Sequence, residues 1–189
     1  MKICVFGAGS IGGVIGGVLA QAGHDVSLIA RGAHLAALKA NGCTVETGGQ
    51  KFTVHPACSD NPADFGPQDY VVVAVKAPAM PSVAAGIAPL LGPDTAVVPA
   101  MNGIPWWFFD GYPAAGPDIQ LPALDPDGAL AAAVSTDRVI GCVVHMGSLV
   151  PEPGVIRHVA DNRLILGEAT GGLSDRLGAF VDAFDGTTL

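Results

Sequence analysis

The sequence has 189 residues, half of them hydrophobic and 14% charged, with 17 acidic and 9 basic residues for a net charge of −8. This composition excludes a disordered chain, and an acidic balance without a Lys/Arg cluster argues against nucleic acid as a partner. No run of about 18 apolar residues predicts a membrane span, and no apolar segment with a cleavage site predicts a signal peptide, so we expect one main cytoplasmic domain without a membrane partner.

The first forty residues alternate between strand and helix patterns. Lys2–Phe6 is a short apolar run typical of a buried strand, and Asp25–Ala30 is a second one. Between them, Ser10–Ala22 has the apolar spacing of an amphipathic helix and ends before Gly23. His34–Ala40 predicts a short second helix. This order is typical of a parallel α/β sheet.

The middle of the chain interrupts this alternation and then resumes it. Cys43–Pro56 alternates polar and apolar residues around two glycines, which predicts a hairpin at an edge of the sheet. A strand over Tyr70–Val75, a helix over Pro81–Leu91 and a strand over Thr95–Ala100 follow. We therefore expect two more strands in the parallel sheet.

The second half of the chain has a different pattern. Asp110–Gly128 is rich in Pro, Gly and Asp, and a structureless segment of this length is usually functional or mobile. Three strand-like segments with hairpin spacing come next, at Arg138–His145, Gly154–Val159 and Arg163–Leu166, and Leu173–Phe184 predicts a last helix. The parallel sheet is therefore expected to be extended by antiparallel strands.

A glycine-rich turn joins the first strand to the first helix. Its residues form the pattern G-x-G-x-x-G and are Gly7, Ala8, Gly9, Ser10, Ile11 and Gly12. In this context the pattern predicts a Rossmann-type dinucleotide site, because the glycines allow the tight turn, the approach of a pyrophosphate and close packing of the helix. The free N–H groups of the helix would hold the phosphates. The alternative is a tight turn that binds nothing.

Arg31 follows the second strand, where a site for NAD places an Asp or Glu. A guanidinium at this position can pair with a 2′-phosphate, which favours NADP(H) over NAD(H). The alternative is a solvated Arg at a strand end.

Two polar residues follow neighbouring strands of the predicted sheet. Lys76 comes directly after a buried strand, and Asn102 follows the next one. Both would emerge at the carboxyl edge, where open α/β sheets bind ligands, and could contact the substrate and the nicotinamide end of the cofactor. The alternatives are a Lys that reaches water and an ordinary Asn-Gly turn.

The cysteines and histidines show no spacing that indicates a metal site. The cysteines are Cys4, Cys43, Cys58 and Cys142, and no pair has zinc or C-x-x-C spacing. Such cysteines are typical of a reducing compartment. We expect no bound metal.

Taken in order, these motifs resemble the ketopantoate reductases (2-dehydropantoate 2-reductases). The matching stretches are residues 3–13, 30–32, 74–77, 101–104, 140–143, 151–158 and 163–168. The resemblance implies an NADP-dependent oxidoreductase that reduces a small 2-keto acid, 2-dehydropantoate, to pantoate in pantothenate biosynthesis. It also implies that Arg31 binds the 2′-phosphate, that the glycine turn binds the pyrophosphate, and that Lys76 and Asn102 contact substrate and nicotinamide.

The resemblance also predicts what this chain lacks. Residues 1–168 correspond to the NADP-binding domain, and residues 169–189 to a terminal helix and the start of a link. The family's general acid lies in a helical C-terminal domain that is absent here, so we expect these 189 residues to be inactive by themselves. A reductase of another 2-keto acid and a non-catalytic NADP(H)-binding module remain as alternatives.

An aromatic run departs from the family pattern. It follows Asn102 and consists of Trp106, Trp107, Phe108 and Phe109. These side chains could pack under the loop that follows, or line a pocket for a substrate larger than 2-dehydropantoate. They could also form a surface that another domain covers. An uncovered apolar surface of this kind predicts self-association.

Overall fold

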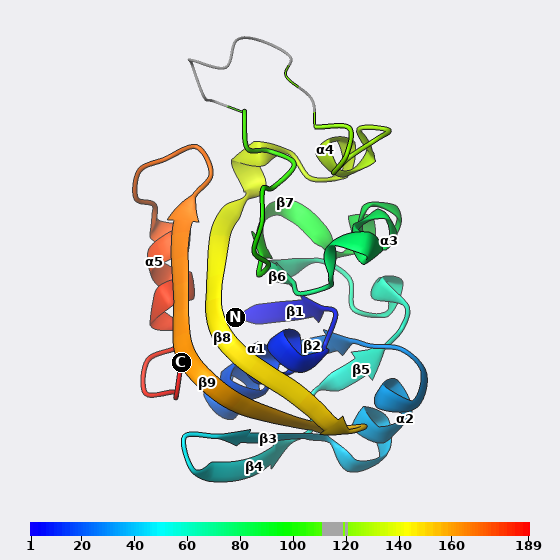
Figure 1. Ribbon diagram of the computed structural model, residues 1–189, viewed down its shortest axis with the longest axis vertical. Helices are drawn as coiled ribbons and strands as arrows, with labels where there is room; N and C mark the ends of the chain where they lie inside the picture. Colours follow the sequence, from blue (N-terminus) through cyan, green and yellow to red (C-terminus); the bar gives the residue numbers. More distant parts are fainter. Residues whose placement is uncertain (111–118, 120) are drawn as a thin grey trace.

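Two β-sheets enclose a central helix in the computed structural model, which describes residues 1–110, 119 and 121–189 (Figure 1). The first sheet is parallel and has the strand order β5-β2-β1-β6-β7. Its strands are β1 (Lys2–Phe6), β2 (Asp25–Ile29), β5 (Ala57–Ser59), β6 (Gln68–Val73) and β7 (Leu91–Pro99). The predicted Rossmann-type sheet is confirmed, and the three-residue edge strand β5 is the one that sequence patterns missed.

The second sheet is mixed and has the order β4-β3-β9-β8. Its strands are β3 (Cys43–Thr47), β4 (Gln50–Val54), β8 (Ile140–Glu152) and β9 (Val155–Glu168). Two isolated parallel bridges, Val97 to Val139 and Ala100 to Cys142, connect the end of β7 to the start of β8. The antiparallel strands therefore do extend the parallel sheet, as predicted, and then curve away to build a second layer.

Two predictions about this second layer were wrong. The hairpin β3–β4 is present, but β3 pairs with β9, so the hairpin lies at the edge of the second sheet and not of the parallel one. Its buried residues Cys43 and Val45 pack toward the helix between the sheets. The segments predicted as two strands, 154–159 and 163–166, are one strand, because β9 continues through an irregularity near Asp161, whose φ is +51°.

Five helices are present in the described residues. They are α1 (Ser10–Gln21), α2 (Gly32–Asn41), α3 (Met80–Gly86), α4 (Ala129–Ala133) and α5 (Asp175–Asp182), with short 3-10 helices at Pro62–Asp64, Ala77–Ala79, Ala88–Leu90 and Thr136–Arg138. The helix predicted over 81–91 is split, because Pro89 cannot donate the backbone hydrogen bond that an α-helix needs there. The short α4 had no recognisable pattern.

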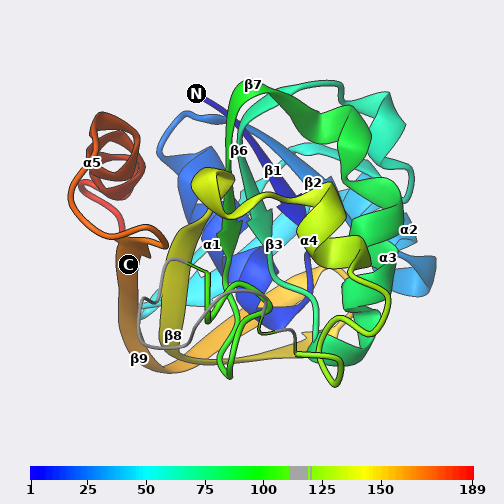
Figure 2. The ribbon, with the colours of Figure 1, turned by 90° about the horizontal axis from the view of Figure 1, so that it is seen from above.

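Helix α1 is buried on all sides, so the prediction of an amphipathic helix was wrong. Figures 1 and 2 show it between the parallel sheet and the long strands β8 and β9. A Cβ on Gly16 would lie 2.7 Å from the Leu28 side chain in β2, and one on Gly17 would lie 2.4 Å from Val45 in β3. The glycines along α1 therefore let both sheets pack directly against the helix backbone.

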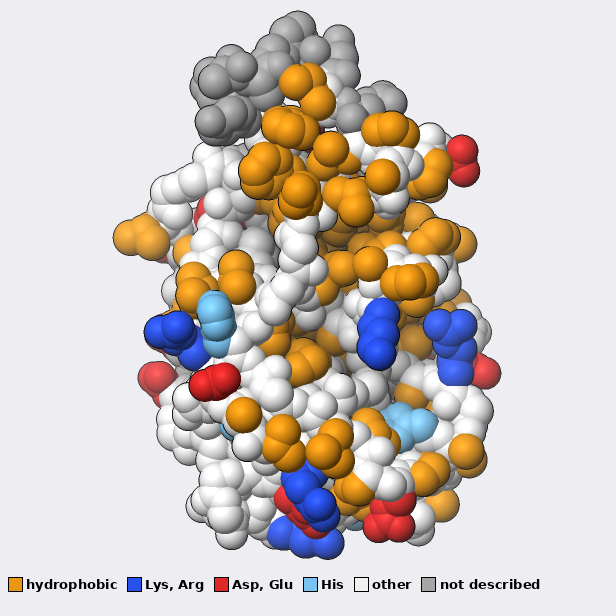
Figure 3. All heavy atoms as spheres, in the orientation of Figure 1, with side chains coloured by type: hydrophobic (Ala, Val, Ile, Leu, Met, Phe, Trp, Pro, Cys, Tyr) orange, Lys and Arg blue, Asp and Glu red, His pale blue; other side chains and the backbone are white. Residues whose placement is uncertain are grey.

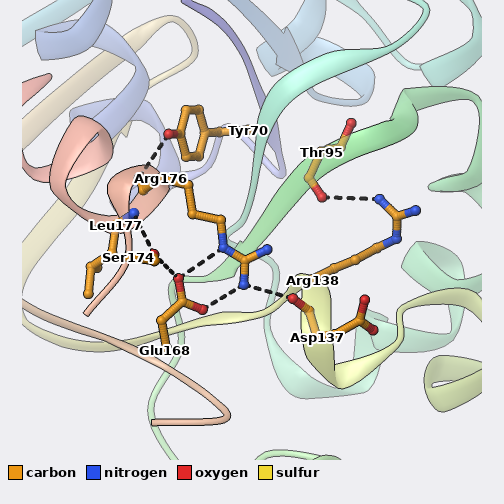
Figure 4. Close-up of polar contacts among 8 residues, drawn as sticks. All are labelled: Tyr70, Thr95, Asp137, Arg138, Glu168, Ser174, Arg176 and Leu177. Atoms are coloured by element: carbon orange, nitrogen blue, oxygen red, sulfur yellow. Dashed lines mark hydrogen bonds and ion pairs between the residues drawn. The ribbon is translucent and has the colours of Figure 1, made fainter. Parts of the chain in front are cut away.

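A polar network attaches α5 to the body of the protein (Figure 4). Arg176 donates from Nε to Oε1 of Glu168 at 2.9 Å and from Nη2 to Oε2 at 2.6 Å. Ser174 donates to the same carboxylate, and Tyr70 donates to the Arg176 carbonyl at 2.8 Å. Phe180 is fully buried beside the Tyr70 ring. The Glu168 side chain is only 5% exposed, so we expect its ion pair with Arg176 to contribute to the stability of the fold.

We expect Glu168→Gln to destabilise the fold at neutral pH and to matter less in acid. The hydrogen bonds from Arg176 lower the pKa of Glu168 below its ordinary value of 4.5. Its stabilising contribution is therefore present above that value and is lost as the pH falls through the lower folded pKa. Loss of the ion pair should cost about 1–2 kcal/mol, measured by urea unfolding at neutral and acidic pH.

Glu46 provides the matched control for this experiment. It also pairs with two cations, but their side chains are exposed, Lys51 to 64% and Arg157 to 50%. Exposed ion pairs contribute little, so Glu46→Gln should leave the unfolding midpoint nearly unchanged. An equal loss at both pH values for Glu168→Gln would contradict the assigned role.

Candidate functional site

A cleft of about 1010 Å³ opens at the carboxyl edge of the parallel sheet. Its walls come from the glycine turn, the ends of β2, β6 and β7, and the tip of the β8–β9 hairpin. Among the residues predicted from the sequence it brings together Gly7, Ala8, Gly9, Ser10, Ile11, Arg31, Lys76 and Asn102. Of the predicted set, Gly12 alone does not line the cleft.

The glycine turn is tight on its inner side and open toward the cleft. Gly7 has φ +102°, and a Cβ there would lie 2.6 Å from the Val75 side chain. A Cβ on Gly12 would lie 2.3 Å from the Gly7 carbonyl oxygen, so Gly12 fixes how closely α1 starts behind the turn. Gly9 differs, because no atom of the described chain lies within 4 Å of its Cβ position. Gly9 therefore faces open space on the cleft side.

The first turn of α1 offers backbone donors to this space. Gly9 is the N-cap, no side chain caps the helix, and no acidic residue lies in its first turn among the described residues. The leading N–H groups of a helix lack intrahelical acceptors and favour an anion. This end of α1 therefore fits a pyrophosphate, which binds helix N-termini through the same groups.

Arg31 lies at the carboxyl end of the second strand and lines the cleft, as predicted from the sequence. It follows β2, precedes α2 as its N-cap in an extended conformation, and is exposed at the rim of the cleft. It forms no ion pair with any carboxylate of the described residues. The guanidinium is thus available to an anionic group at this end of the cleft.

Lys76 and Asn102 lie at the other end of the cleft. Lys76 is exposed and is the N-cap residue of the 3-10 helix Ala77–Ala79. Asn102 donates from Nδ2 to the Val144 carbonyl at 2.9 Å and accepts from the Val144 N–H at 2.8 Å. Asn102 therefore holds β8 against the cleft, and its amide keeps one hydrogen and one lone pair for a ligand.

His34 is a cleft residue that sequence reasoning missed. Its Nδ1 accepts the Gly154 N–H at 3.1 Å, so the proton lies on Nε2, which is 2.8 Å from the Ala8 carbonyl oxygen. One imidazole thus ties the glycine turn to the tip of the β8–β9 hairpin. Its position one turn into the helix after Arg31, at the same sheet edge, was the only available signal.

We expect His34→Ala to weaken dinucleotide binding about tenfold, because loss of two hydrogen bonds of about 1 kcal/mol each loosens the turn. Isothermal titration with NADPH measures the effect. His24→Ala is the control, because the side-chain hydrogen bond of His24 within the described residues is to the Ala183 carbonyl, away from the cleft. The role assigned to His34 is wrong if the two variants bind NADPH with the affinity of the unmodified chain.

The buried thiols provide no nucleophile. Burial raises the pKa of Cys4, Cys43 and Cys142 to about 12, so these thiols are protonated at neutral pH. Within the described residues, no group of three or more His, Cys, Asp and Glu residues could hold a metal ion, and no helix is long and apolar enough to cross a membrane.

Comparisons with known proteins point to one family. The family model of ketopantoate reductase PanE/ApbA matches residues 3–108. A 2-dehydropantoate 2-reductase of Mesorhizobium japonicum is 44% identical over 178 residues, 94% of this chain and 55% of the relative. The oxidoreductase YkpB of Bacillus subtilis is 28% identical and also covered over 55% of its length. The chain thus spans about half the length of these curated relatives.

Solved structures give the same result. A candidate ketopantoate reductase of Ralstonia solanacearum MolK2 is 48% identical and superposes with a TM-score of 0.91, over 98% of this chain and 58% of that one. The 2-dehydropantoate 2-reductase of Porphyromonas gingivalis W83 is 28% identical with a TM-score of 0.79, over 100% of this chain and 62% of that one. Because the family model matches more than half of the residues, this chain belongs to the ketopantoate reductase family of NAD(P)-dependent oxidoreductases.

Proposed function

We propose that this chain is the NADPH-binding half of an oxidoreductase that reduces a 2-keto acid, with 2-dehydropantoate, named in its relatives, as the first substrate to test. The observation that carries the proposal is the single cleft in which the glycine turn, Arg31, Lys76 and Asn102 meet. In this assignment the α1 N-terminus binds the pyrophosphate, and Arg31 binds the 2′-phosphate that distinguishes NADPH from NADH.

Lys76 and Asn102 are proposed to hold the substrate. The Lys76 ammonium can donate to the carboxylate and to the keto oxygen as negative charge develops there. The remaining N–H of Asn102 can fix the same oxygen, because the rest of its amide is held by Val144. NADPH, when bound, supplies the hydride for the keto carbon. The keto oxygen takes a proton to become the hydroxyl group.

We propose that this proton comes from outside the 189 residues. The chain spans 55% of the Mesorhizobium japonicum relative, and the family resemblance places the general acid in a further helical domain. Positioned proton transfer contributes about 10²–10⁴-fold, so the chain alone should bind NADPH with negligible turnover.

One assay separates the possible functions. NADPH and NADH are titrated into the chain, and NADPH oxidation with 2-dehydropantoate is followed with the chain alone and joined to the remaining part of the Mesorhizobium japonicum relative. Turnover only in the joined protein supports the proposal. NADPH binding without turnover in either indicates a binding module, faster turnover of other keto acids indicates another substrate, and absence of NADPH binding overturns the proposal.

Self-association and a cytoplasmic location are further parts of this proposal. In the aromatic run, Phe108 is 51% exposed, and Ile104 just before it is 60% exposed, so apolar surface is available to a second copy. The four cysteines are free, which suits the reducing cytoplasm. Sedimentation of the chain and of Phe108→Ser tests the association.

A further inference from the structure

A second pocket, of about 750 Å³, adjoins the cofactor cleft. The two share Ala77, Met101 and Asn102, so the pocket begins where the reacting end of the cleft stops. Its walls come from the segment after β7, the start of α3, the first residues of β8 and the last residues of β9. In Figure 3, hydrophobic side chains gather in the upper part of the visible face of the molecule. We name this space the aromatic pocket.

The aromatic pocket is apolar and carries no free charge. Trp106 and Trp107 form one wall, with their rings edge to face at a centroid distance of 4.5 Å, and Leu130 and Leu166 add aliphatic surface. Glu168 is the only charged residue among the described lining residues, and its carboxylate is neutralised by Arg176.

One polar atom in the wall has no partner. The Trp106 Nε1–H is buried and makes no hydrogen bond within the described part of the chain. A buried donor left unpaired costs free energy, so such groups usually meet a ligand or water. Asn102 adds a polar amide at the end that the pocket shares with the cleft, so the pocket combines a large apolar wall with a polar group, as is typical of a site for a small organic molecule.

We infer that the aromatic pocket receives the apolar side chain of a 2-keto acid whose keto and carboxylate oxygens lie at Lys76 and Asn102. This inference rests on the proposed function and specifies its substrate class as 2-keto acids with an aromatic or long branched side chain. Asn102 lines both spaces, so an acid held at its amide would direct its side chain into the pocket. The small hydroxylated chain of 2-dehydropantoate would leave most of this apolar wall uncovered.

Gly167 offers a way to fill the pocket without disturbing the fold. It pairs with Gly141 across β8 and β9, so side chains at both positions would share a face of the sheet. A Cβ on Gly141 would lie 3.9 Å from Trp107, which places this face toward the pocket, and a Cβ on Gly167 meets no described atom within 4 Å. Valine suits a strand, so Gly167→Val should fold and occupy the pocket.

The test uses the tryptophan fluorescence of the chain, because its only two tryptophans are Trp106 and Trp107. The probes are 3-phenyllactate and lactate, added with saturating NADP⁺. We expect 3-phenyllactate to change the emission and to bind at least about tenfold more tightly than lactate, since the phenyl group is buried. Gly167→Val should remove this preference while NADPH affinity stays unchanged, and Gly178→Ala on α5 should change neither.

Each other outcome contradicts a specific statement. If NADPH binds but 3-phenyllactate and lactate behave alike, or Gly167→Val keeps the preference, the inference is wrong and the proposed function stands. If no probe binds and the protein dimerises until Gly167→Val prevents it, the pocket is a protein contact, which also overturns the inference. If NADPH does not bind, the proposed function itself fails.

Discussion

Replacing Gly9 by Asp is expected to weaken NADPH binding about a hundredfold without unfolding the protein. The Gly9 φ of −80° lies outside the left-handed region that favours glycine, and no described atom lies within 4 Å of its Cβ position. The fold therefore has room for the new side chain. That room is the space in front of the α1 N-terminus, where a carboxylate would replace and repel the pyrophosphate.

The expected loss is large because two effects add. The Asp side chain blocks the approach of the phosphates, and like charges in contact cost several kcal/mol. About 3 kcal/mol corresponds to a loss of about two orders of magnitude in affinity. Isothermal titration with NADPH, paired with a thermal melt without ligand, measures both halves of the prediction.

Gly12→Ala gives the opposite result and serves as the control. A Cβ at Gly12 would lie 2.3 Å from the Gly7 carbonyl oxygen and 2.8 Å from the Val5 side chain. Relieving the first contact requires the backbone to shift, which destabilises the fold. This variant should melt at a lower temperature. If Gly9→Asp bound NADPH normally, the turn would not be a phosphate site. If Gly9→Asp had a melting temperature as low as that of Gly12→Ala, the fold itself would require glycine at position 9.

The sequence predicted the parallel sheet and the cleft because both depend on local patterns. Buried strands read as apolar runs, and parallel strands place the residues after them at a common edge. Arg31, Lys76 and Asn102 could therefore be assigned to one site without knowing any distance between them.

What sequence reasoning missed depends on contacts between distant segments. Helix α1 reads as amphipathic, because nothing near it in the chain reveals that Ile156 and Val45 pack on its second face. The link from His34 to Gly154 spans 120 positions, and the clamp from Asn102 to Val144 spans 42. The aromatic pocket likewise needs β8 and β9 beside the aromatic run, so only the folded chain brings its walls together.

Replacing Arg31 by Ala is expected to reduce NADPH affinity by one to two orders of magnitude and to leave NADH affinity unchanged. NADPH differs from NADH only by the 2′-phosphate, so NADH reports whether the rest of the site is intact. Arg31 is exposed, caps α2 only through its backbone, and pairs with no carboxylate in the described residues, so its side chain has no structural role to lose. Charge-assisted hydrogen bonds contribute about 1.5–3 kcal/mol, which corresponds to roughly tenfold to a hundredfold in affinity.

Two further variants make the Arg31 prediction specific. Arg31→Lys keeps the charge but not the two-pronged geometry, so it should retain part of the preference for NADPH. Arg31→Asp places a carboxylate where NAD sites carry one, so it should favour NADH by accepting a hydrogen bond from the ribose hydroxyl. Added salt should narrow the difference between the two cofactors in the unmodified chain, because Arg31 and its ligand lie at the exposed rim. Equal losses of NADPH and NADH affinity in Arg31→Ala would show that Arg31 contributes to binding of both cofactors and does not recognise the 2′-phosphate.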